Sequence, residues 1–254
     1  MRNYGDKKRM ITVILNCYKR PQYIKEQIDS IKNQTVKAKE IIVWYNKPED
    51  KKQYNISNLG AKVILCDYNY KFHGRFAAAL LAKTKYVAIF DDDTIPGIKW
   101  FENCLNCIEE KPGIYGASGV VLHGDAYLPN HKVGWNGTSK NTEIEEVDLV
   151  GHAWFLERKD LTYLWREEPY SWDNGEDMQL SYFAQKFGNV KTYVPPHPPD
   201  DIEKWGSTRG DEYGMDFNSS WRKSDHMILR NKIAAKQIQN GWKTVRSNKA
   251  REDD

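Results

Sequence analysis

The stretch Tyr86-Val-Ala-Ile-Phe-Asp-Asp-Asp93 joins five apolar residues to three consecutive aspartates. Its apolar part predicts a buried β-strand, because it is short, unbroken and contains β-branched and aromatic residues. Alternate side chains of an extended chain share one side, so Asp91 and Asp93 are expected to lie together. Two carboxylates on one side suit Mn²⁺ or Mg²⁺, especially where a phosphate supplies further oxygens. The simpler alternative, a helix cap before Pro96, requires only one carboxylate.

The residues before this strand predict an alternation of strands and helices. Three further strands are predicted, over residues 11–15, 40–45 and 61–65. An amphipathic helix follows Pro21, and the alanine-rich residues 76–82 predict a second helix. This order, with continuous apolar strands, predicts a mostly parallel α/β sheet covered by helices on both faces. Sheets of this kind bind ligands at the carboxyl ends of their strands.

The second half of the chain has a different pattern. Residues 147–155 and 190–194 predict strands, and a helix over 176–187 is expected to be capped from Asp173 and Asn174. Residues 200–221, after the proline-rich stretch 195–199, are rich in glycine, aspartate and aromatic residues and predict a loop. Residues 225–239 predict a basic helix, followed by a frayed end.

The composition excludes several classes of protein. The chain has 254 residues with 38 Lys and Arg against 35 Asp and Glu, a net charge of +3 that is too balanced for a nucleic-acid binder. The longest apolar cluster, residues 77–82, is too short to span a membrane, and residues 1–9 lack the apolar core of a signal peptide. We therefore expect a soluble, cytoplasmic protein whose cysteines are reduced thiols: Cys17, Cys66, Cys104 and Cys107.

Several catalytic motifs are absent from the sequence. It contains neither a glycine-rich dinucleotide loop nor a phosphate-binding P-loop, and it lacks both the serine-hydrolase elbow and the HExxH zinc motif. The sequence therefore combines an aspartate cluster after the fourth strand with the lack of a glycine-rich phosphate loop. This combination limits the enzyme families to which the chain can belong.

The motifs resemble glycosyltransferases of the GT-A fold, which use nucleotide-sugar donors and a metal-binding Asp-x-Asp motif. The segment 12–21 is similar to the first strand and loop of family 2 members, and the segment 175–181 resembles their Glu-Asp segment. The segments 43–46 and 90–94 look equally like the exostosin-like transferases of family 64. The resemblance implies an α/β, Rossmann-like mixed sheet flanked by helices in a single domain over residues 1–221. A donor half (about 11–95) and an acceptor half (about 96–221) would precede a basic helix and tail over 222–254.

The resemblance also implies residues that bind the nucleotide-sugar. Cys17, Tyr18 and Arg20 would line the base pocket after the first strand. Asn46, where many family members have aspartate, would approach the uracil or ribose. Arg75 falls where the family often places a basic residue that points towards the donor.

The same comparison assigns roles to the aspartate cluster. Asp91 would contact the ribose and take part in metal binding, Asp92 would belong to the donor site, and Asp93 would hold the metal on the diphosphate. His197 follows the strand after the Glu-Asp helix, where several GT-A enzymes place a third metal ligand. A histidine in a loop between prolines is as often structural as it is a ligand.

The Glu-Asp segment would act on the acceptor. The resemblance makes Asp177 the general base that deprotonates the acceptor hydroxyl, with Glu176 assisting it or binding the acceptor. The alternative role of Asp177 is helix capping. His152 and Trp154 fall on a strand that faces the acceptor in the family. Three tryptophans could stack on sugar faces, although aromatic residues more often lie in the core: Trp172, Trp205 and Trp221.

These features predict a Mn²⁺- or Mg²⁺-dependent transferase that moves a sugar, preferably from a UDP-sugar, to a glycan or another hydroxyl acceptor with inversion. Alternatives are a retaining exostosin-like transferase, a nucleotidyltransferase, and a non-catalytic carbohydrate-binding relative. A nucleotidyltransferase should have a glycine- and arginine-rich loop near the first strand, and none is present. The basic segment 222–254 is either a solvated helix face or a peripheral contact with an anionic membrane.

Overall fold

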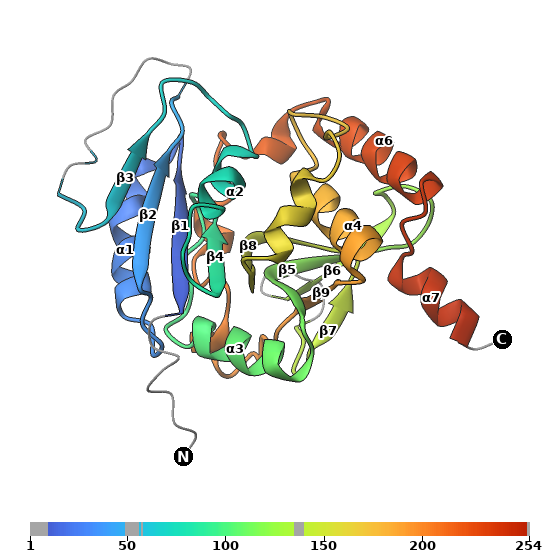
Figure 1. The fold of residues 1–254 in the computed structure, drawn as a ribbon, viewed down its shortest axis with the longest axis horizontal. Helices are drawn as coiled ribbons and strands as arrows, with labels where there is room; N and C mark the ends of the chain where they lie inside the picture. Colours follow the sequence, from blue (N-terminus) through green and yellow to red (C-terminus); the bar gives the residue numbers. More distant parts are fainter. Residues whose placement is uncertain (1–9, 49–55, 57, 135–139, 253–254) are drawn as a thin grey trace.

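A nine-stranded mixed sheet runs through the middle of the molecule (Figure 1). The computed structural model describes residues 10–48, 56, 58–134 and 140–252. The strand order is β3-β2-β1-β4-β8-β5-β9-β7, and β6 pairs with β5 outside this path. The prediction of one α/β domain with a mixed sheet flanked by helices is therefore confirmed.

The N-terminal half contains the parallel part of the sheet. Its strands match the four predicted ones: β1 (Ile11–Cys17), β2 (Glu40–Tyr45), β3 (Lys62–Leu65) and β4 (Tyr86–Phe90). β2 and β4 flank β1 on its two sides. Every side chain of β1 is buried, with Val13 and Leu15 in one core cluster and Ile14 in the other. A strand that is covered on both faces needs this unbroken apolar sequence.

Helices cover both faces of the sheet. The core cluster on one face contains residues of α1 (Ile24–Lys32) and α3 (Trp100–Glu110). The cluster on the other face contains residues of α2 (Gly74–Ala79) and α4 (Glu176–Gly188). α3 was not predicted from the sequence, although its buried residues recur at helical spacing. Two of these residues are Cys104 and Cys107, which are free thiols.

The strands of the C-terminal half, which pair antiparallel except for the parallel pair β5 and β9, complete the sheet. They are β5 (Gly113–Leu122), β6 (Asn130–Gly134), β7 (Glu145–Val147), β8 (Leu149–Glu157) and β9 (Lys191–Val194). β8 pairs antiparallel with β4 and joins the two halves. β5 is fully buried although its glycines argue against a strand. Gly116 and Gly119 lie so close to Val150 and Val147 that neither position has room for a Cβ.

The remaining helical segments lie between these elements or follow them. They are η2 (Pro21–Tyr23), η3 (Asp160–Trp165), η4 (Ile202–Lys204), α5 (Gly210–Tyr213), η5 (Ser220–Arg222), α6 (His226–Gln239) and α7 (Val245–Glu252). Three of them lie at 202–222, where the sequence predicted a loop. The predicted basic helix is α6, and the end that was expected to fray contains α7.

The C-terminal segment is not an appendage to the domain. Ile233 and Ala234 of α6 share a buried cluster with Met178 and Tyr182 of α4. This packing corrects the boundary predicted at residue 221, because α6 completes the core around α4. None of the described helices is both long and apolar enough to cross a membrane.

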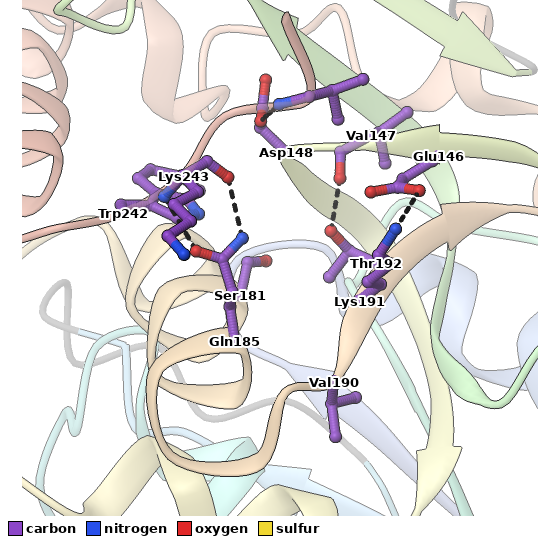
Figure 2. Close-up of a pocket in the computed structure, with 11 residues that line it drawn as sticks. Glu146, Val147, Asp148, Ser181, Gln185, Val190, Lys191, Thr192, Trp242 and Lys243 are labelled. Atoms are coloured by element: carbon purple, nitrogen blue, oxygen red, sulfur yellow. Dashed lines mark hydrogen bonds and ion pairs between the residues drawn. The ribbon is translucent and has the colours of Figure 1, made fainter. Parts of the chain in front are cut away.

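Two side chains, one on α4 and one between β7 and β8, fasten the segment after α6 (Figure 2). The Gln185 side chain donates to the Lys243 carbonyl and accepts from the Lys243 N–H, both at 2.8 Å. The buried carboxylate of Asp148 accepts from the backbone N–H groups of Leu122 and Val245, each at 2.7 Å. The pocket beside these residues has a volume of about 10 Å³, which is room for one water molecule at most.

Replacing Asp148 with asparagine should destabilise the fold by about 2 kcal/mol, because one of the two buried N–H groups would lose its acceptor. Urea unfolding at pH 7 measures this change. Asp125→Asn, at an exposed position, is the matched control and should change the free energy of unfolding little. Equal stability of both variants would show that Asp148 does not anchor the segment.

Candidate active site

A cleft of about 390 Å³ opens beyond the end of β4. Its walls come from α2, β8, α4, the segment 210–221 and α6, so residues that are far apart in the sequence share one space. Of the residues predicted to bind the donor or the metal or to act as the base, four line it: Arg75, Asp91, Glu176 and Asp177. Arg230 also lines it, although the sequence placed this residue in a basic tail.

The three aspartates follow β4 at a topological switch point of the sheet. The chain passes from β1 to β2 on one side, and β4 lies on the other side of β1. Crevices at such points are the usual ligand sites of α/β sheets. Gln27 of α1 donates its Nε2 to the carbonyls of Asp91 at 2.7 Å and Thr94 at 2.9 Å. α1 thereby holds the backbone turn that carries the carboxylates.

Arg20 neutralises part of this cluster. Its Nη1 lies 2.8 Å from Asp92 Oδ1 and 3.1 Å from Asp93 Oδ2, and its Nη2 lies 2.7 Å from Asp216 Oδ1. Burial and the neighbouring Asp93 raise the pKa of Asp92, and the ion pair with Arg20 opposes that rise. Arg20 and Asp92 were predicted to bind the donor; the structure shows them as a buried pair that supports the turn. Asp216, which the sequence analysis missed, ties the segment 210–221 to this pair.

Asp91, Asp93 and His152 form a group that could hold a metal ion. One ligand atom from each lies within 4.8 Å of the others. His152 is brought there by the sheet, because β8 runs antiparallel to β4 and the Asp91 N–H donates to the His152 carbonyl at 2.9 Å. Its φ of 66° is rare for a residue with a side chain, and such strain is typical of functional sites. Burial lowers the pKa of His152, which favours the neutral imidazole that binds metals.

The structure does not bring His197 to this group. Its ring is completely buried; Nδ1 lies 2.7 Å from the Pro195 carbonyl, and Nε2 accepts from the Gly206 N–H at 3.1 Å. Both ring nitrogens are therefore used inside the protein, and His197 is a structural histidine. This corrects its predicted role as the third ligand, for which His152 is the better candidate.

Arg75 connects the aspartate cluster to the Glu-Asp segment. Its Nη2 lies 2.9 Å from Asp91 Oδ1 and 3.0 Å from Glu176 Oε1. Burial, together with nearby carboxylates, raises the pKa of Asp91 to about 8, against the influence of Arg75. Burial and Asp177 raise the pKa of Glu176 to about 7. So many buried carboxylates fit a divalent cation, since a bound Mn²⁺ or Mg²⁺ would favour the ionised ligands.

Asp177 has a separate cationic partner. Arg230 of α6 donates from Nη2 to Oδ2 at 2.7 Å and from Nη1 to Oδ1 at 3.2 Å. Burial alone would raise the pKa of Asp177, but the ion pair with Arg230 outweighs it and holds the pKa below the usual value. A sequence signal for Arg230 exists but was not used in the prediction. Arg230 shares a helical spacing with Ile233, Ala234 and Gln237, and these four residues form the buried face of α6.

The predicted base-pocket residues lie after the neighbouring strands. Asn46 donates to Asn69 Oδ1 at 2.7 Å, and Asn69 donates to the Tyr18 hydroxyl at 3.1 Å, so the structure brings Tyr18 and Asn46 together. Cys17 is different, since it is only 1% exposed and belongs to the apolar core. Burial raises the pKa of the Cys17 thiol to about 12. The prediction that Cys17 lines the base pocket is therefore wrong, because its side chain lies in the core.

The three tryptophans have different surroundings. Trp221 is exposed and lines the cleft. Trp172 is also exposed, and its ring centroid lies 4.9 Å from that of His73. Trp205 donates its indole N–H to the Pro198 carbonyl at 2.8 Å and packs against the core. Trp205 is therefore structural, whereas Trp221 lines the cleft and its stacking on a sugar stays a prediction.

Comparison with known proteins identifies the family. The sequence pattern described as "Glycosyl transferase family 2" matches residues 12–164. The chain is 33% identical over 115 residues to an uncharacterized glycosyltransferase of Methanocaldococcus jannaschii, a match that covers 42% of this chain and 40% of that protein.

Solved structures support the same fold. The crystal structure of S. aureus TarS matches with a TM-score of 0.51 and 18% identity over 75% of this chain and 37% of the TarS chain. A structure of TarS 1–349 gives a TM-score of 0.50 and 15% identity over 73% of this chain and 60% of that one. At these identities the likeness concerns the fold, and the chain spans less than two thirds of each of these proteins.

Acidification should destabilise the fold through His197. Burial lowers the pKa of this imidazole from 6.5 to about 4, so the unfolded chain binds a proton between these values that the folded chain excludes. Its contribution to stability is complete above pH 6.5 and decreases as the pH falls towards 4. Between pH 7 and pH 5 the loss should be about 2 kcal/mol.

Urea unfolding of the parent and of His197→Gln at both pH values isolates this contribution. Glutamine can donate and accept hydrogen bonds but does not titrate, so the variant should lose about 2 kcal/mol less than the parent on acidification. An identical loss in the two proteins would refute the assignment of the proton to His197.

Proposed function

The chain belongs to glycosyl transferase family 2, and from this premise we propose that it transfers a sugar from a UDP-sugar to a hydroxyl acceptor with inversion. One observation carries the proposal: Asp91 and His152, two members of the group that could hold a metal ion, line the same cleft as Asp177, whose carboxylate is paired separately with Arg230. Such an arrangement can bind a metal–diphosphate and place an acceptor hydroxyl on the far side of the sugar.

The donor end of the proposed site consists of Asp91, Asp93 and His152. These residues would hold Mn²⁺ or Mg²⁺, which would supply positive charge to stabilise the leaving diphosphate. An imidazole beside two carboxylates favours Mn²⁺ over Mg²⁺, because Mg²⁺ prefers oxygen ligands. Arg75 stands next to this group and can bind phosphate or sugar oxygens as the charge shifts.

The acceptor end contains the proposed base. Asp177 Oδ1 already accepts from the Met178 N–H and from Arg230, whereas Oδ2 accepts from Arg230. Oδ2 therefore has the greater capacity for the acceptor hydroxyl and is the atom we assign to proton abstraction. The hydroxyl oxygen then attacks the anomeric carbon while the bond to the diphosphate breaks. Because the match is to family 2, we favour this inverting displacement over the retaining mechanism of exostosin-like transferases.

Glu176 is the competing candidate for the base, since its pKa of about 7 suits proton abstraction. Its partner Arg75 also contacts Asp91, one of the proposed metal ligands, so Glu176 is linked to the donor side of the site through Arg75. We therefore assign Glu176 to positioning Arg75.

UDP should bind much more tightly in the presence of Mn²⁺. Calorimetry with and without Mn²⁺ measures this coupling, which Asp93→Asn should abolish and His152→Ala should weaken at least about tenfold, since each variant loses a ligand. His197→Gln is the matched control and should bind as the parent does. UDP binding that ignores Mn²⁺ in the parent would overturn the metal-dependent proposal.

Asp177→Asn should reduce kcat by about 10³-fold while UDP–Mn²⁺ binding stays at the parent level, because the amide cannot accept the proton. The active donor is first found by screening nucleotide sugars for metal-dependent hydrolysis. Glu176→Gln should instead weaken the binding of UDP–Mn²⁺. If Glu176→Gln lost kcat with intact donor binding and Asp177→Asn did not, the two roles would be exchanged.

A further inference from the structure

α6 contributes a residue to the acceptor end of the cleft. We propose that Arg230 is a positioning residue, which fixes the carboxylate of Asp177 in the orientation that receives the acceptor proton. This inference rests on the proposed function, since it presumes that Asp177 is the base. The sequence placed Arg230 in a basic tail with contacts to membrane or solvent.

The guanidinium contacts both carboxylate oxygens of Asp177. Two roughly parallel N–H···O bonds, at 2.7 and 3.2 Å, define the plane of the carboxylate as a single bond could not. Both partners are buried, with side-chain exposures of 9% for Arg230 and 12% for Asp177. A buried pair of this kind is weakly screened by solvent, so loss of one partner leaves a buried charge without compensation.

Arg230 is itself held from two further directions. Its guanidinium lies 4.3 Å from the centroid of the Tyr127 ring, a cation–π contact. Its Nη1 also lies 3.3 Å from Asn174 Oδ1, and the Asn174 amide is 3.1 Å from His226 Nδ1 at the start of α6. α6 is thereby bonded at two points to the turn that leads into Asp177.

The turn is shaped to receive α6. Gly175 has a φ of 85°, a conformation that residues with side chains rarely adopt. A Cβ on Gly175 would lie 2.6 Å from Ile233 Cδ1, so the glycine also permits the close packing of α6. The expected caps, Asp173 and Asn174, are replaced by this glycine, and Asn174 is free to bind α6 instead.

The charges around Asp177 make the choice of an arginine specific. Glu176 on α4 repels the carboxylate, while His73 before α2, His152 on β8 and His226 on α6 face it. Burial lowers the pKa of each histidine, to about 4 for His73 and His226, so these rings are neutral near pH 7. Arg230 stays charged at every working pH and keeps Asp177 ionised.

Arg230→Lys and Arg230→Gln test the proposal on the full chain. Lysine keeps the charge and loses the two-pronged contact, so kcat should fall at least about tenfold while the acid limb of the kcat–pH profile stays within about half a unit of the parent. Glutamine loses the charge as well, and the acid limb should rise by at least about one pH unit. With donor and Mn²⁺ at saturating concentrations, the pH dependence of kcat reports pKa values in the complex with bound substrates.

Two controls separate this proposal from its premise. Lys232→Gln removes a charge from the exposed side of α6 and should behave as the parent. UDP–Mn²⁺ binding should be intact in both Arg230 variants, which shows that they fold. If the parent transfers no sugar or Asp177→Asn is active, the proposed function fails; if the parent is active and both Arg230 variants keep its kcat and acid limb, only the inference fails. Unfolding of both variants would assign Arg230 to the fold and overturn the positioning role.

Discussion

The burial of several carboxylates in one cleft is the constraint on which the rest of this structure depends. Asp91, Asp93, Glu176 and Asp177 lie at or near one cavity, where like charges cannot all remain ionised without cations. Three arginines from separate parts of the chain supply these cations: Arg20 after β1, Arg75 on α2 and Arg230 on α6. The loop after β1, α2 and α6 must therefore all be placed so that their arginines compensate the negative charge of these carboxylates.

Two of the arginines also give two adjacent acids different partners. Glu176 and Asp177 are neighbours in the sequence, yet one pairs with Arg75 and the other with Arg230. Their pKa values consequently move in opposite directions, upward for Glu176 and downward for Asp177. Pairs of acids whose environments separate their pKa values are typical of catalytic sites. Here the separation follows the two arginine partners, since Arg75 also contacts Asp91 of the aspartate cluster and Arg230 belongs to α6.

The elements that the sequence predicted well are those with strong local patterns. The strands β1 to β4 have unbroken apolar sequences, and α1 and α4 have helical spacing or a clear end. β5 was missed because its glycines oppose strand formation, and only the close packing against Val147 and Val150 explains them. His197 was misplaced for a related reason, because a histidine's role depends on what its ring nitrogens contact.

The sequence by itself determined the α/β order, the aspartates at the end of β4 and the Glu-Asp segment, because each depends on neighbours within a few residues. The tertiary structure decided which groups complete these motifs. His152 joins Asp91 only through the antiparallel pairing of β4 with β8, and Arg230 reaches Asp177 only because α6 packs on Gly175. Arg230 and Asp177 are 53 residues apart in the chain, so no local sequence pattern can predict that they are in contact. Their meeting is fixed by packing.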